Sequence, residues 1–234
     1  MKRHRQKKFR NILLEHIKNN TKEYTILLSI FIIGIIIGVL LINHTSNNQR
    51  LELSNYIYNY VSNFDNCKDE LDNIKILNDS IINNSITFLV LWIVGLTATL
   101  TPIIYGMVLF KGLCLGYTMS TIIGVLGVNK GLVFAISLLL PQNLILIPAI
   151  LAMALSGIIV HTRTSLDYNE RIFDRKKKYK ESLKHEIIRH SAFSIIIIFF
   201  VIISCFVEAF ISINAFKWVS QFIQNWLEDK RKIK

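Results

Sequence analysis

The chain has 234 residues, of which 52% are hydrophobic and 18% are charged, and its formal net charge is +11. This apolar content is too high for a soluble domain of this size, and the charges avoid five long stretches almost completely. Uncharged stretches of that length are typical of membrane-spanning helices, so we expect an all-α polytopic membrane protein with about five spans. Because topology accounts for the positive charge, we expect no nucleic-acid binding. The apolar stretches are residues 26–42, 86–110, 112–128, 131–160 and 192–216.

Basic residues predict which polar segments face the cytoplasm. Residues 1–25 contain eight Lys or Arg against two acidic side chains, and residues 161–191 contain nine basic against five acidic ones. Residues 43–85 instead have a net charge of −3. Because cytoplasmic flanks carry an excess of Lys and Arg, we expect 1–25 and 161–191 inside the cell and 43–85 outside.

The external segment, residues 43–85, predicts an amphipathic helix or helix pair. Its apolar residues recur at alternating spacings of four and three, and they include Phe64 and Leu71. Such a seam could pack on the rest of its own chain, make a homo-oligomer or bind an external partner. For a partner, Phe64 and Leu71 are our candidate contact residues.

The second and third apolar stretches are separated by Lys111 alone, which predicts a tight hairpin at the cytoplasmic face. Pro102 lies inside the second stretch and predicts a kink. Small residues recur at four-residue spacing in the first and third stretches, a pattern that lets helix backbones approach closely in lipid. These candidate packing residues are Gly34, Gly38, Gly112 and Gly116.

Residues 131–160 are too long for one straight span, and the sequence Pro141-Gln142-Asn143 interrupts them. We expect a re-entrant half-helix over 131–140, a polar turn, and then a full span to residue 160, because broken backbone is tolerated at membrane depth where protein or water covers it. Asn143 can cap this span, and Pro148 lies in its first turns.

The tail, residues 217–234, predicts an amphipathic interfacial helix, with Trp218, Phe222 and Trp226 at four-residue intervals. Five crossings place this tail outside, although its basic end would fit the inner face better.

No residue pattern supports catalysis, a cofactor or a metal. His185 and His190 are five residues apart, which puts them out of phase on a helix, so we expect both to be solvated. Glu208 is the one unusual residue, because a carboxylate within an apolar span should face the bundle interior. Either Gln142 or Asn143 could bond to it structurally, or this polar group could form a partner or substrate site.

Three short segments together resemble the stage II sporulation protein M family, and the resemblance covers nearly the whole chain. Many relatives carry His at the position of Gln142, so the chain departs from them there. The segments are LPQNLILIPA at 140–149, KGLCLG at 111–116 and CFVEAF at 205–210.

The resemblance implies a non-catalytic membrane scaffold for forespore engulfment during endospore formation. Its expected partners are membrane lipid and stage II sporulation proteins P and D, which degrade peptidoglycan. Its expected location is the mother-cell membrane at the sporulation septum and the engulfing front. The alternative from a different class is a transporter or permease-like subunit that uses Glu208 and the broken helix at Pro141–Asn143.

The expected topology can be tested at Cys67, which lies in the external segment. A membrane-impermeant thiol reagent should label Cys67 in intact cells that lack a wall, and a Cys67→Ser variant should stay unlabelled. Labelling that requires permeabilisation would place residues 43–85 in the cytoplasm and reverse the topology.

Overall fold

The computed structural model describes residues 20–46, 48, 49, 51–53, 55, 70–97, 100–169, 175–212 and 214. Within these residues all regular structure is helical, and five helices are long and apolar enough to cross a membrane. The predicted all-α polytopic class and the number of spans are therefore confirmed. The tail at 217–234 and most of the external segment lie outside the described residues.

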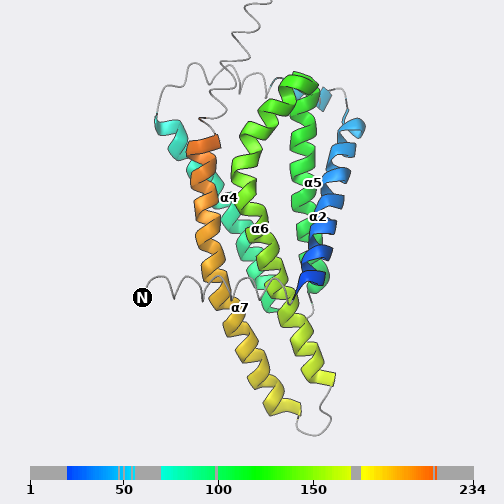
Figure 1. Cartoon of the computed structure of the whole chain (residues 1–234), viewed down its shortest axis with the longest axis vertical. Coiled ribbons are helices and arrows are strands. Elements are labelled where there is room, and N and C mark those ends of the chain that lie inside the picture. The colour runs from blue at the N-terminus through cyan, green and yellow to red at the C-terminus, as the bar shows by residue number, and fades with distance from the viewer. Residues whose placement is uncertain are drawn as a thin grey trace, which may run out of the picture.

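The five long helices run alternately up and down (Figure 1). A short 3₁₀ turn (Ile42–His44) follows the first helix, and a π-helical turn, η2 (Val207–Ser212), follows the last. The long helices are α2 (Thr21–Leu41), α4 (Glu70–Leu96), α5 (Thr101–Leu126), α6 (Val128–Asn169) and α7 (Arg175–Phe206).

Helix α6 is the centre of the bundle. It contacts α2, α4, α5, α7 and η2. In its most apolar stretch 61% of the residues are buried, whereas the corresponding share in the other four helices is 22–33%. Residues 153–160 are buried without interruption, because neighbouring helices surround α6 on all sides at that level. Fully buried side chains of the other helices pack around it, among them Leu27, Leu91, Ile104 and Val201.

The predicted boundary between the second and third spans is wrong. The chain turns between Leu96 and Thr101, and Lys111 lies within α5 instead of in a hairpin. Helix α4 therefore includes the polar residues before position 86, which the sequence interpretation assigned to the external segment. These residues can enter the bundle because Ser80 and Asn84 face its interior, where each is 6% exposed.

Pro102 and Pro141 also have roles different from those predicted. Pro102 lies in the first turn of α5, where its missing N–H breaks no helical hydrogen bond, so it makes no kink. Helix α6 continues through Pro141 and Pro148, so the predicted re-entrant half-helix at 131–140 is wrong. Each proline removes one hydrogen bond, and the helix bends over its first half without ending (Figure 1).

Helices α2 and α5 pack through interlocking glycines. A Cβ atom added at Gly34 or Gly38 would lie 2.3 or 2.2 Å from a carbonyl oxygen of α5. A Cβ at Gly112 or Gly116 would lie equally close to a carbonyl oxygen of α2. The two backbones are thus in direct contact, which only glycine allows, and α2 and α5 form one paired unit.

Gly112→Leu should separate this unit, because a clash with backbone cannot be relieved by a rotamer change. Overpacking of this kind costs at least about 1–3 kcal/mol, so the melting temperature of the purified protein should fall clearly. Gly106→Leu is the matched control on the same helix, because a Cβ there meets nothing within 4 Å. Equal melting temperatures for the two variants would contradict the glycine contact.

Candidate functional site

Polar side chains from four helical elements meet inside the bundle, and we call this group the polar centre. It consists of Ser80 and Asn84 of α4, Lys111 of α5, Gln142 of α6 and Glu208 of η2. Gln142 lies about 21 Å along α6 from its first residue, at 1.5 Å per residue, and Lys111 about 15 Å from the start of α5. The polar centre is therefore far from both ends of α5 and of α6.

Hydrogen bonds connect three of the four elements. The carboxylate oxygen Oε2 of Glu208 accepts from the Ser80 hydroxyl and from Nε2 of Gln142, the latter at 2.5 Å. Nδ2 of Asn84 donates to Ser80 Oγ at 3.2 Å and to Cys205 Sγ at 3.7 Å. In a bilayer the carboxylate has no water to solvate it, so these donors replace water.

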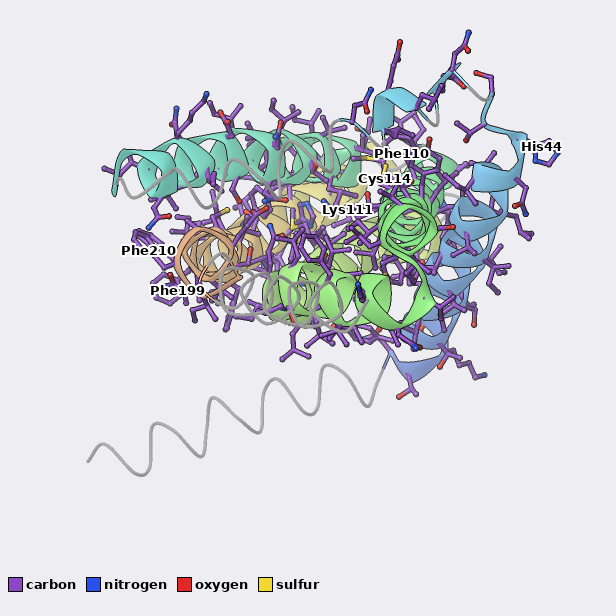
Figure 2. All side chains as sticks on the ribbon, turned by 90° about the horizontal axis from the view of Figure 1, so that it is seen from above. His44, Phe110, Lys111, Cys114, Phe199 and Phe210 are labelled. Atoms are coloured by element: carbon purple, nitrogen blue, oxygen red, sulfur yellow. The ribbon has the colours of Figure 1, made fainter. Side chains whose placement is uncertain are left out.

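Lys111 brings a positive charge to the same region. Figure 2 shows it on the side of α5 that faces the middle of the bundle, while Phe110 beside it is 64% exposed. Lys111 lies fifteen residues before the end of α5, and Gln142, which bonds to Glu208, lies fourteen residues after the start of α6, so the short turn between these helices places both at about the same depth. A single charge at the centre of a membrane span costs about 2.5–3.5 kcal/mol on insertion scales. Complementary charges reduce that cost.

The π-helical turn positions Glu208. Helix α7 changes to π-helical hydrogen bonding at Val207, one residue before the carboxylate, and Ala209 in the same turn is fully buried. A π turn inserts an extra residue, so side chains after it face a different direction from those of a regular helix. Such turns are common at functional sites. Nothing in the apolar run around Glu208 indicates this turn in advance.

The structure separates two residues that the sequence interpretation treated together. Gln142 bonds to Glu208, whereas Nδ2 of Asn143 donates to the carbonyl of Leu139 on its own helix at 2.7 Å. Pro141 and Pro148 bend α6 and contribute no donor to the carboxylate. Phe64 lies outside the described residues, and Leu71 lies in the first turn of α4, where only the backbone is described.

An apolar groove of about 340 Å³ lies between α5 and α6. Leu115 and Met119 of α5 and Leu140, Asn143 and Leu144 of α6 are among its lining residues. None of the residues of the polar centre lines it. The groove therefore does not open onto the carboxylate of Glu208.

His190 corrects a second prediction, because it is 1% exposed and not solvated. Its Nδ1 lies 2.8 Å from the hydroxyl of Ser156 on α6, and a Cβ at Gly95 of α4 would lie 2.7 Å from its Nε2. Because Gly95 has no side chain, the imidazole of His190 fits between α4 and α6. His185 is exposed, as expected, and among the described residues no group of three His, Cys, Asp or Glu could hold a metal ion.

Gln142 and Asn143 offer a matched pair of variants. Gln142→Leu should lower the melting temperature of the purified protein, because loss of a hydrogen bond to a buried charge costs about 1–3 kcal/mol. Asn143→Leu should have little effect, because its side chain bonds only to a carbonyl that also belongs to the helix backbone. A larger loss from Asn143→Leu would contradict the assignment of Gln142 as the donor.

Comparison with known proteins identifies the family of the chain. The profile of the family described as Stage II sporulation protein M matches residues 27–213, a range that includes every residue of the polar centre. An uncharacterized protein of Methanocaldococcus jannaschii is 27% identical over 187 residues, which cover 79% of this chain and 90% of the relative. No solved structure matches the chain. The chain belongs to the stage II sporulation protein M family.

Proposed function

We propose that this protein is a non-catalytic membrane scaffold for the peptidoglycan-degrading machinery that drives forespore engulfment. Family membership supports a role in sporulation at a membrane. The observation that carries the scaffold role is the bonding within the polar centre. Its hydrogen-bonding side chains join α4, α6 and η2 to one another, which is what a rigid support requires.

The scaffold would act through its external segment. Stage II sporulation proteins P and D are the proposed partners, and the mother-cell membrane at the septum and engulfing front is the proposed location. Residues 43–85 are the longest segment that the charge distribution places outside the cell, and the part before Asn73 lies outside the α4 span. The bundle would then hold an external binding segment at a fixed position in the membrane while the partners cleave the wall.

The transporter alternative has less support. It was based on a broken helix at Pro141–Asn143 together with the buried Glu208, and α6 is continuous through that region. The carboxylate is bonded to Ser80 and Gln142, and the groove between α5 and α6 does not include it. A transported ion or proton would need an opening to this group, which the groove between α5 and α6 does not provide.

The scaffold role can be tested with the double variant Phe64→Asp, Leu71→Asp in sporulating cells. Two charges on the apolar seam should abolish co-purification of stage II sporulation proteins P and D and arrest engulfment, while the amount of the protein in membranes stays normal. The matched control is Asn66→Asp with Asn73→Asp, which adds the same charge at two positions of the same segment that are already polar and lie off the seam.

Normal co-purification from the seam variant would exclude the seam as the binding surface. Arrested engulfment with intact complexes and normal abundance would favour the transporter alternative, because function would then fail without loss of the proposed partners.

A further inference from the structure

We infer that Lys111 is the countercharge of Glu208 and that this pair joins the α2–α5 unit to the rest of the bundle. The bundle is then stable when both charges are present or when both are absent, and unstable when either charge stands alone.

The position of Lys111 on its helix is that of a core residue. Ile104, Val108, Lys111 and Leu115 recur at spacings of four, three and four, which places them on one face of α5. Ile104 and Val108 are each 1% exposed, and Leu115 packs partly buried against the same core. Lys111 therefore lies in an otherwise apolar stripe that faces the bundle, as Figure 2 also shows.

Lys111 cannot reach water by extending its side chain. It is ten residues from the start of α5 and fifteen from the end, about 15 and 22 Å at 1.5 Å per residue. A lysine stem is far shorter than either distance, so the snorkelling that places terminal lysines at the membrane surface is not available here. The ammonium must be stabilised within the protein.

Glu208 likewise needs a nearby charge of opposite sign. Its direct hydrogen-bond donors, Ser80 and Gln142, are neutral, so they solvate the carboxylate but leave its charge uncompensated. Lys111 is a cation at the same depth, because it lies fifteen residues before the end of α5 while Gln142, which bonds to Glu208, lies fourteen residues after the start of α6. The other charged side chains that the structure describes on the five helices precede the apolar part of their helix: Lys22 and Glu23 on α2, Lys75 and Asp79 on α4, Lys130 on α6, and Lys184, Glu186 and Arg189 on α7.

The pair also connects parts of the fold that no described side-chain hydrogen bond connects. On α5, Thr118 and Thr121 bond to carbonyls of their own helix, and Ser120 bonds to the carbonyl of Val39 on α2. Within the described residues, no side-chain hydrogen bond or ion pair joins α5 to α4, α6, α7 or η2, so the proposed attraction between Lys111 and Glu208 is the polar interaction that can hold them together. Apolar packing supplies the remainder of that contact.

A double-mutant cycle tests the pair in the full-length protein, with Lys111→Met, Glu208→Gln and the combination. Glutamine is suitable because both donors meet a single oxygen of Glu208, and an amide oxygen can accept the same bonds. We expect each single variant to lower membrane abundance at least threefold and to reduce the melting temperature in nanodiscs. The combined variant should recover most of both losses.

Lys75→Met is the matched control, because it removes a cation from an exposed position at the outer part of α4. It should behave like the unchanged protein. Either of two results would overturn the inference: Lys111→Met behaving like Lys75→Met, or a combined variant whose losses equal or exceed the sum of the single losses. Recovery in the combined variant is informative even if both single variants fail to accumulate, because overpacking or a lost hydrogen bond would not be repaired by removing a second charge.

Discussion

A carboxylate inside a membrane bundle needs donors that the lipid cannot supply, and this requirement organises the structure around Glu208. The donors come from α4 and α6, so those helices must pass the carboxylate at the same level as η2. Lys111 brings a positive charge from the middle of α5. The carboxylate thereby fixes the relative depth of four helical elements in the membrane. Packing between purely apolar helix surfaces would determine that depth only weakly.

The same requirement gives a reason for two irregular features. Helix α6 bends at its prolines, and Gln142, directly after Pro141, is the residue that donates to Glu208. The π turn at Val207 changes the direction in which the carboxylate points while leaving Cys205 and Ala209 buried. Both irregularities lie next to the hydrogen bond from Gln142 to Glu208, where a regular helix would present a different face.

The sequence was sufficient for the fold class and the five spans because these follow from apolar length alone. It was insufficient for the boundaries between spans, and Lys111 shows why. A lone lysine between apolar runs has the same appearance whether it lies in a turn or faces a carboxylate on another helix, and only the three-dimensional partner distinguishes them. Ser80 and Asn84 were assigned to the external helical segment for the same reason, since polar residues that bond inside a bundle are locally indistinguishable from solvated ones. His190 is a third case: its burial depends on Gly95, nearly a hundred residues earlier in the chain.

Ionisable residues inside membranes usually mark a path for ions or substrates, so their arrangement decides how they should be interpreted. A transport site needs a group that changes partners and an opening through which a solute reaches it. Here the carboxylate already has two donors and a countercharge, and the groove between α5 and α6 lies elsewhere. Lys111 and Glu208 also belong to different packing units, one held by backbone contact through glycines and the other by hydrogen bonds. A polar group in that position stabilises one arrangement of the helices against sliding, and a fixed arrangement is what a support for other proteins needs and what an alternating transporter must avoid.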